Sequence, residues 1–514
     1  MKTFNFSIKK LSILCAAIII LVSSSCKKDK IAVNPPMDAD ESITGPNLAI
    51  YAVTLDNQLL SLNAKNPASA TKQTAITGLQ ADEKILAIDF RPATGQLYGV
   101  GSTSRIYVIN TETAVARAIG TSAFTPAIDG AAVGFDFNPT VDRIRLVSTS
   151  GQNLRLNPET GTVAFTDGVI NGAAGATVTA AAYTGNKAGS SATVLFAIDV
   201  ANDKLYKQDP PNNGTLVEVG KLGFDFQSVG GFDISPDGTN ALAVLTKGDK
   251  SALYSINLET GKATKIKNDF ASVVTSLAIP TEPVAYAVNA NNELMIFNPN
   301  NATPVLKAIT GMASGENVLG IDMRPVNGQL YALGSTSRLY TINASSGAAL
   351  AVGTAPFTTL LSGSDFGFDF NPTVDRVRIV SNTGQNLRVN PNDGLVAAVD
   401  GALSPGTPSV TAAAYTNNFA GATTTTLFDI DTQTNMLYKQ DPPNAGTLVP
   451  VGSLGVTAMA SNGFDIGGTS GTAYALLTVG GVTKIYTINL TTGAAIAGAT
   501  LTGGVKAFTI GLGF

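Results

Sequence analysis

The chain has 514 residues, enough for more than one domain, and a mildly acidic formal net charge of −4. This charge argues against a nucleic-acid partner, because binding to phosphates needs basic surface patches. The sequence contains no histidine and only two cysteines, which excludes Ser-His-Asp and Cys-His catalysis and leaves too few ligands for a structural zinc site.

The first predicted element is a signal peptide over residues 1–25. Lysines precede an apolar run from Leu11 to Val22, which is too short to span a bilayer, and small residues lead into Cys26. The arrangement resembles a bacterial lipoprotein signal, and the resemblance implies cleavage before Cys26 and acylation of its thiol and new amino group. The alternative is an ordinary secretory signal that happens to contain this cysteine.

Residues 26–46 follow as the predicted lipid anchor and flexible tether, because they are polar and contain prolines. The charged residues directly after Cys26 resemble the surface-export signals of Bacteroidetes-type lipoproteins. We therefore expect an outer-membrane lipoprotein of the bacterial cell envelope, attached to the membrane through its lipid. It is either surface-exposed or faces the periplasm.

After the tether, short runs of alternating apolar and polar residues follow one another. Units of four such runs cover residues Ile85–Gly120, Val133–Phe165, Thr177–Gly220 and Gly230–Lys265. Alternation places one face inward, and the Gly, Pro, Asn, Asp and Ser residues between the runs supply turns. With 52 glycines, 24 prolines and only 14% charged residues, the pattern predicts an all-β fold. Four-stranded units at this spacing are typical of a β-propeller.

The fifth unit is divided between two parts of the chain. Leu48–Ala75 supplies three runs, and Val273–Ile279 supplies the missing innermost strand. Pairing of these two segments would close a ring of five units. Val505–Phe514 ends the second half in the same way.

The units occur twice because the chain is a tandem duplication. Gly134–Pro158 and Gly367–Pro391 share 20 of 25 residues at an offset of 233. The halves correspond to residues 47–280 and 281–514. We predict tandem β-propellers, that is, two five-bladed rings of four-stranded blades. The alternative is one ten-bladed ring, in which Val273–Ile279 belongs to the next unit.

Three motifs that occur in both halves carry a resemblance to a known family. They are Asp-x-Arg-Pro-x-x-Gly-Gln-Leu-Tyr, Ser-Thr-Ser-Arg-x-Tyr-x-Ile-Asn and Phe-Asp-Phe-Asn-Pro-Thr-Val-Asp-Arg. Together they resemble the bacterial family known as domain of unknown function 4394, in two tandem copies. The resemblance implies a propeller-like secreted or surface protein, and it carries over no catalytic residue.

Aspartate recurs on the first strand of three of the five units in each half. The residues are Asp89, Asp136, Asp233, Asp322, Asp369 and Asp465. First strands line the channel of a propeller, so three carboxylates there can bind a hard cation such as Ca²⁺. They can also serve as acid and base in glycoside chemistry, as in some five-bladed glycosidases. We favour a third interpretation, in which they accept backbone N–H bonds in turns or pair with Arg91 and Arg324.

Four arginines on adjacent predicted strands are candidate ligand contacts. They are Arg145, Arg155, Arg378 and Arg388. Their guanidinium groups suit a glycan that carries carboxylates or sulfates. Cross-strand pairing with Asp142 or Asp375 is the alternative that we favour.

Tyrosines and two rim turns complete the candidates. Regularly placed tyrosines are predicted to pack between units rather than to stack on sugars; they are Tyr98, Tyr107, Tyr206 and Tyr254. Residues 208–212 and 440–444 are predicted turns at equivalent rims, where loops commonly bind partners.

The primary functional prediction is a lipid-anchored, non-catalytic binding or scaffolding protein outside the cytoplasm. Its partner is an extracellular protein or a polysaccharide, and the duplication provides two similar sites and hence avidity. We expect a monomer that needs no cofactor, with Ca²⁺ as the one candidate ion. The alternatives are a polysaccharide hydrolase or lyase that uses the channel carboxylates, and a structural cell-surface protein.

Overall fold

The computed structural model describes residues 42–514, except for the side chains of residues 460–462. The predicted signal peptide, the lipidated Cys26 and most of the predicted tether lie outside the described residues. From Ile43 onward the chain is already held in place: the Ile43 N–H donates to the Lys265 carbonyl oxygen at 2.9 Å, and the Lys267 N–H donates to the Ile43 carbonyl oxygen at 2.8 Å. No helix within residues 42–514 is long and apolar enough to cross a membrane.

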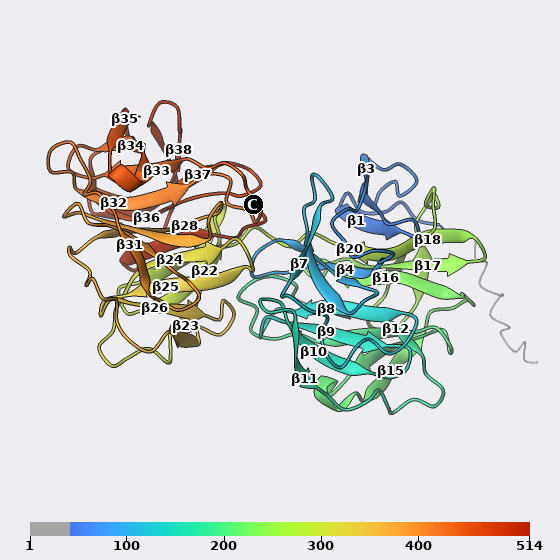
Figure 1. Ribbon diagram of the computed structural model, residues 1–514. Coiled ribbons are helices and arrows are strands. Elements are labelled where there is room, and N and C mark those ends of the chain that lie inside the picture. Colours follow the sequence, from blue (N-terminus) through green and yellow to red (C-terminus); the bar gives the residue numbers. More distant parts are fainter. Residues whose placement is uncertain (1–41) are drawn as a thin grey trace, which may run out of the picture. The chain divides into compact units, whose positions relative to one another are not determined.

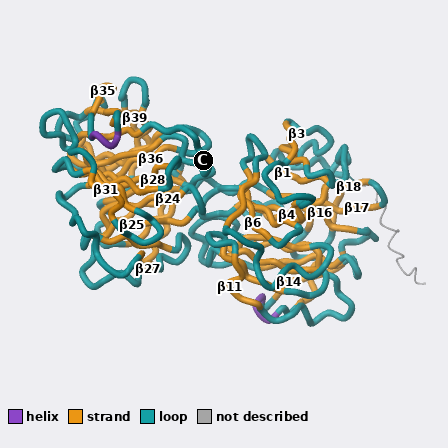
Figure 2. The backbone as a smooth tube through the Cα atoms, in the orientation of Figure 1, coloured by secondary structure: helices purple, strands orange, loops and turns teal. Residues whose placement is uncertain are grey.

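Strands dominate the described chain (Figure 2). They form four-stranded antiparallel sheets, and the described residues otherwise contain two single-turn 3₁₀ helices, η1 (Pro211–Asn213) and η2 (Pro443–Ala445). The predicted all-β class and the predicted four-stranded units are confirmed. The alternating runs form strands because β-branched and aromatic residues fit a pleated, half-buried surface.

Five sheets are built from residues before Pro280. In order from the innermost strand outward they are β20 (Val274–Ala278), β1 (Ala49–Thr54), β2 (Gln58–Asn63), β3 (Lys72–Ala75); β4 (Ile85–Phe90), β5 (Leu97–Gly101), β6 (Arg105–Ile109), β7 (Ala116–Ile119); β8 (Val133–Asn138), β9 (Arg143–Ser148), β10 (Asn153–Asn157), β11 (Thr162–Thr166); β12 (Val178–Tyr183), β13 (Leu195–Asp199), β14 (Lys204–Gln208), β15 (Leu216–Lys221); and β16 (Ser228–Ile234), β17 (Ala241–Lys247), β18 (Lys250–Ile256), β19 (Ala263–Lys265).

Five more sheets repeat this arrangement after Pro280. They are β40 (Val505–Ile510), β21 (Ala285–Asn289), β22 (Glu293–Asn298), β23 (Asn301–Ala308); β24 (Val318–Arg324), β25 (Gln329–Gly334), β26 (Arg338–Ile342), β27 (Ala349–Val352); β28 (Phe366–Asn371), β29 (Arg376–Ser381), β30 (Asn386–Val389), β31 (Val396–Val399); β32 (Val410–Tyr415), β33 (Leu427–Asp431), β34 (Met436–Gln440), β35 (Leu448–Ser453); and β36 (Ala458–Ile466), β37 (Ala473–Val479), β38 (Val482–Ile488), β39 (Ala495–Thr500).

One sheet in each half combines the two ends of that half, as predicted. Strand β20 pairs with β1, with Tyr51 opposite Ala278, and the two strands lie together in Figure 1 although they are far apart in the chain. Strand β40 pairs with β21 in the same way, with Ala285 opposite Ile510. Each pairing completes the divided fifth unit.

The innermost strands contact one another in a closed cycle. In the first half the cycle runs from β4 to β8, β12, β16, β20 and back to β4, and in the second half it runs from β24 to β28, β32, β36, β40 and back to β24. Between the strands of the first cycle there is a cavity of about 10 Å³, roughly the size of one water molecule. Small residues permit this close approach: a Cβ atom on Gly231 would lie 2.3 Å from the Leu277 nitrogen.

Apolar side chains from neighbouring sheets form the core. Tyr98 from β5 meets Phe137 from β8 edge to face, with ring centroids 5.2 Å apart. Tyr107 and Tyr206 are also buried, and Tyr254 is half-buried and stacks on Phe224. The prediction that these tyrosines pack between units is therefore confirmed, because the hydrophobic effect favours burial of their rings.

Candidate functional site

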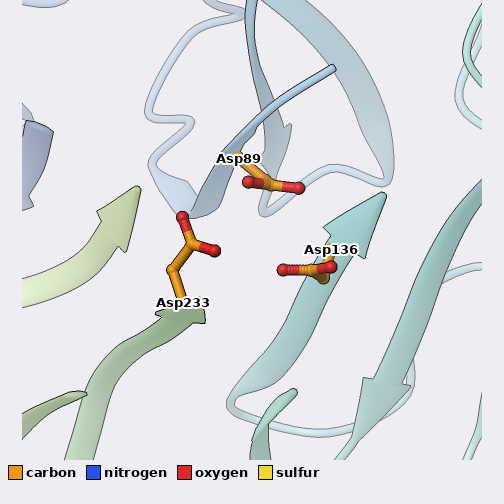
Figure 3. Close-up of side chains that lie close together, drawn as sticks. All are labelled: Asp89, Asp136 and Asp233. Atoms are coloured by element: carbon orange, nitrogen blue, oxygen red, sulfur yellow. The ribbon is translucent and has the colours of Figure 1, made fainter. Parts of the chain in front are cut away.

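Each half brings three of the predicted aspartates together. One carboxylate oxygen from each of Asp89, Asp136 and Asp233 lies within 4.8 Å of the other two, and the three side chains converge from different strands (Figure 3). The second half forms the same cluster. Its members are Asp322, Asp369 and Asp465.

The position of the aspartates within their strands explains why they meet. Each stands near the end of an innermost strand, and the innermost strands lie side by side in the cycle. The two remaining strands of the first cycle carry Ala182 and Ala278 at the corresponding position, whereas those of the second cycle carry Ala414 and Thr509. The register of the strands thus places three carboxylates and two small side chains at one level.

The carboxylates satisfy backbone N–H groups around the whole cycle. Asp89 accepts from the Phe137 N–H at 2.7 Å, and Asp136 accepts from the Tyr183 N–H at 2.9 Å, so each links its own strand to the next sheet. In the first half the donors are the N–H groups of Phe90, Phe137, Tyr183, Ile234 and Ile279. In the second half they are those of Met323, Phe370, Tyr415, Ile466 and Ile510. Innermost strands are sheet edges, so these N–H groups need such acceptors.

One oxygen in each cluster has no hydrogen-bond partner among the described residues. It is Oδ2 of Asp136 in the first half and Oδ2 of the equivalent Asp369 in the second. Both side chains are 1% exposed. Buried polar atoms are normally satisfied, so the same exception at equivalent positions needs an explanation.

The electrostatics of the clusters are dominated by burial. Burial raises the pKa of Asp233 to about 7 and that of Asp465 to about 6. Burial, and then the charge of neighbouring aspartates, raises the pKa of each remaining carboxyl well above its usual range; these are Asp89, Asp136, Asp322 and Asp369. The clusters therefore favour uptake of positive charge, as protons or as a cation.

Arg91 and Arg324 do not neutralise these clusters, so that part of the structural interpretation was wrong. Arg91 forms ion pairs with Asp142 and Glu159, and Arg324 pairs with Asp375. The other part, acceptance of backbone N–H bonds, is what the carboxylates do. The donors, however, include residues of the neighbouring strand, 46 to 48 positions away in the chain, and not only residues of the adjacent turn.

The candidate arginines form a second repeated cluster. Arg145 and Arg155 lie opposite each other on β9 and β10, and both bind Asp167, at 2.7 and 2.8 Å. The equivalent residues of the second half repeat this geometry; they are Arg378, Arg388 and Asp400. The predicted partners Asp142 and Asp375 were wrong, because those carboxylates pair with other arginines.

The two arginines of each cluster differ in exposure. The Arg145 side chain is 2% exposed and donates to Asn153 and to Asn212, which lies in the rim turn 208–212. The Arg155 side chain is 24% exposed, and its guanidinium lies 4.0 Å from the ring centroid of Phe165. Arg145 thus fixes the rim turn, and Arg155 remains accessible from solvent.

The sequence profile of one family matches residues 58–278 and 293–511, which together cover most of the chain. The family is described as "Domain of unknown function (DUF4394)". The chain belongs to the DUF4394 family. The two matched regions correspond to the two copies predicted from the repeated motifs. No protein of curated function matches the chain.

Two solved structures are similar to the DUF4394 chain at 13% sequence identity. One is the extracellular domain of a protein described as a one-component system, BT4673 from B. thetaiotaomicron, with a TM-score of 0.25 and 88% of this chain covered. The other is PorZ, a bacterial surface component of the type-IX secretion system of Porphyromonas gingivalis, with a TM-score of 0.26 and 89% covered. The DUF4394 chain spans 59% of the length of each of these chains.

A difference between the two DUF4394 copies reveals a buried acid that sequence reasoning missed. Asp429 on β33 stands where the first copy has Ala197 on β13. It is fully buried, neither of its carboxylate oxygens has a hydrogen-bond partner among the described residues, and burial raises its pKa to about 8. Alignment of the copies was the available signal, since the first copy has an apolar residue there.

Proposed function

We propose that the chain is a lipid-anchored, extracytoplasmic binding or scaffolding protein built from two five-bladed β-propellers, one for each DUF4394 copy. The closed cycle from β4 through β20 supports a five-membered ring for residues 47–280, and the cycle from β24 through β40 supports one for residues 281–514. Because each cycle closes within its own half, the contacts favour two rings over one ten-bladed ring. Lipid attachment through Cys26 rests on the signal sequence.

A single observation carries the preference for binding over hydrolysis. The six carboxylates that a hydrolase or lyase would use are 1% exposed, and five of the six oxygens in each cluster accept backbone N–H bonds. A glycosidase needs an acid and a second carboxylate that flank the scissile bond of a bound sugar. Carboxylates that are buried and occupied in this way are better suited to holding the strands together.

The accessible arginines favour an anionic polysaccharide as the ligand. Each arginine cluster contains two guanidinium groups and one carboxylate, so it retains one positive charge. That charge is accessible at Arg155 and Arg388, whose side chains are 24% and 32% exposed. In the first copy Phe165, 55% exposed, offers an aromatic face beside Arg155. Nε and Nη2 of Arg155 already donate to Asp167, so a sugar carboxylate or sulfate would meet the remaining Nη1 beside the aromatic ring.

Two equivalent sites on one chain would act together on a long repeating ligand. Binding at the second site becomes intramolecular once the first is occupied, so avidity exceeds the affinity of either site. Binding through two sites at once also accounts for the presence of the same arginine cluster in both copies.

The proposal is tested by retention of the purified protein, residues 27–514, on immobilised glycans. We would compare a sulfated, a uronic-acid and a neutral glycan, and measure new reducing ends in the same samples. The variant is Arg155→Ala with Arg388→Ala, which removes the accessible guanidinium while Arg145 and Arg378 still bind Asp167 and Asp400. The matched control is Arg105→Ala with Arg338→Ala, which removes the same charge from half-exposed equivalent positions at the start of β6 and β26.

We expect retention on the anionic glycans, roughly tenfold weaker in the variant, unchanged in the control and reduced by salt. Equal retention on the neutral glycan, or no effect of the variant, would contradict a site at these arginines. New reducing ends would instead support the hydrolase. No retention on any glycan would leave a protein partner as the better proposal.

A further inference from the structure

Within the part of the chain that the structure describes, the aspartate clusters lack a positively charged partner. None of the ion pairs among residues 42–514 includes any of the six carboxylates. Their hydrogen-bond donors are backbone N–H groups together with, in the second half, the Thr509 hydroxyl and the Asn418 amide. Several carboxylates cannot remain ionised together in a buried site unless something neutralises them.

Each cluster contains one carboxylate oxygen that has no hydrogen-bond partner among residues 42–514. Oδ2 of Asp136 has no partner while Oδ1 accepts from the Tyr183 N–H, and the side chain faces Asp89 and Asp233 in Figure 3. The same atom of Asp369 is free in the second copy. An unsatisfied, fully buried oxygen at the same place in both copies indicates a ligand that donates positive charge to it.

We propose that each three-aspartate cluster binds one hard, oxygen-preferring cation of the Ca²⁺ type. Three oxygens that lie within 4.8 Å of one another leave a central point at most about 2.8 Å from each, since the greatest such distance is 4.8 Å divided by √3. Ca²⁺ binds oxygen at about 2.3–2.6 Å, so a small inward movement of the carboxylates suffices. Mg²⁺ needs about 2.0–2.1 Å with strict octahedral geometry and fits less well.

The chemistry of the donors excludes softer ions as the preferred occupant. All three side chains of each cluster offer carboxylate oxygen, and no cysteine or histidine takes part. Carboxylate ligands suit Ca²⁺, Mg²⁺ and Mn²⁺, whereas copper and zinc prefer imidazole or thiolate. An ion between Asp89, Asp136 and Asp233 would tie together three of the five innermost strands, because the three residues come from β4, β8 and β16.

The two sites are not identical. In the second half the Thr509 hydroxyl oxygen lies 2.9 Å from Oδ1 of Asp322 and 2.7 Å from Oδ2 of Asp465. Ala278 stands at the equivalent position of the first half. Thr509 adds a fourth side-chain oxygen, so we expect the second site to bind the cation more tightly than the first.

The test is Ca²⁺ binding to the chelator-stripped protein, residues 27–514, by equilibrium dialysis and by the shift of its melting temperature. The variants are Asp136→Asn, Asp369→Asn and the double substitution. Asparagine keeps an oxygen that accepts from the Tyr183 or Tyr415 N–H, but it removes the charge and the free oxygen. The control is Asp56→Asn, a substitution of an exposed turn aspartate.

We expect two bound ions per chain in the wild type and the control, one in each single variant and none in the double variant, with the calcium-dependent rise in melting temperature lost in parallel. Thr509→Ala should weaken one of the two sites. The inference is overturned if the stripped wild type binds no Ca²⁺ at about 10 mM, well above the weakest protein sites, because the clusters then hold protons alone. It is equally overturned if the folded double variant binds as much Ca²⁺ as the wild type.

Discussion

Replacement of Asp429 by alanine should stabilise the protein, and the gain should grow with pH. Asp429 lies opposite Ala413 and Tyr438 in its sheet, so its side chain shares their face. Ala413 and Tyr438 belong to an apolar cluster between two sheets, and the first copy has Ala197 at the same place in an equivalent cluster. Alanine therefore fits the site in this fold.

The magnitude follows from the pKa of the carboxyl. It is about 8 in the folded protein, because burial disfavours the charged form more than nearby Arg378 favours it, against an ordinary value of 3.8. A raised folded-state pKa of an acid means that the unfolded chain ionises first. The loss of folding free energy that the Asp429 carboxyl causes is therefore nearly absent below pH 3.8. It grows between pH 3.8 and pH 8 and is constant above pH 8. It reaches about 4 kcal/mol at pH 7 and remains about 2 kcal/mol at pH 5, at 1.36 kcal/mol per pKa unit.

The assay is urea unfolding of the wild type and Asp429→Ala from pH 4 to pH 8, followed by circular dichroism, with hydrogen exchange to locate the stabilised half. Loss of the carboxyl leaves a small cavity that costs about 1 kcal/mol, so the net gain at pH 7 should be about 3 kcal/mol. Comparison of the two proteins at each pH cancels the titration of all other groups. The reverse substitution, Ala197→Asp, should destabilise the first half with the opposite pH dependence. A stability difference that stays constant from pH 4 to pH 8 would refute the reasoning.

Two further predictions concern the innermost strands. Truncation after Gly504 removes β40, which pairs with β21 and contacts β24 and β36. Limited proteolysis should therefore degrade the second half while the first half survives. Equal loss of both halves would contradict independent closure of the two cycles. Gly231→Ala should destabilise the protein far more than Gly238→Ala. Both glycines have positive φ, but only a Cβ at Gly231 would clash with a neighbouring strand, 2.3 Å from the Leu277 nitrogen. In urea unfolding we expect the free energy of unfolding to fall by about 1 kcal/mol for Gly238→Ala, the control, and by several kcal/mol for Gly231→Ala. Similar losses for the two variants would argue against close packing of the innermost strands.

The positions of the aspartates could be predicted from the sequence, but most of their bonding partners could not. Alternation and turn residues located the first strand of each unit, and duplication identified Asp89 with Asp322 and Asp136 with Asp369. The carboxylate of Asp136, however, binds an N–H group 47 positions away. Such a partner becomes evident only when the next innermost strand is placed beside it.

The arginine clusters show the same division. The sequence placed Arg145 and Arg155 on neighbouring strands, and the register of β9 and β10 agrees. The sequence suggested cross-strand pairing with Asp142, whereas the structure selects Asp167, which follows β11. Ion pairing depends on distance in space, and a carboxylate three residues away can point toward another sheet.

The sequence by itself determined the all-β class, the tandem duplication and the four-stranded units, because the repeat is visible in the chain and strand periodicity and turn chemistry are local properties of it. Tertiary structure alone decided that the two ends of each half pair, that the aspartates are buried and satisfy N–H groups of neighbouring strands, and that Asp429 has no hydrogen-bond partner among residues 42–514. Burial and unsatisfied hydrogen bonds arise when sheets pack against one another, and the free energy of a carboxylate depends on those neighbours far more than on the residues beside it in the chain.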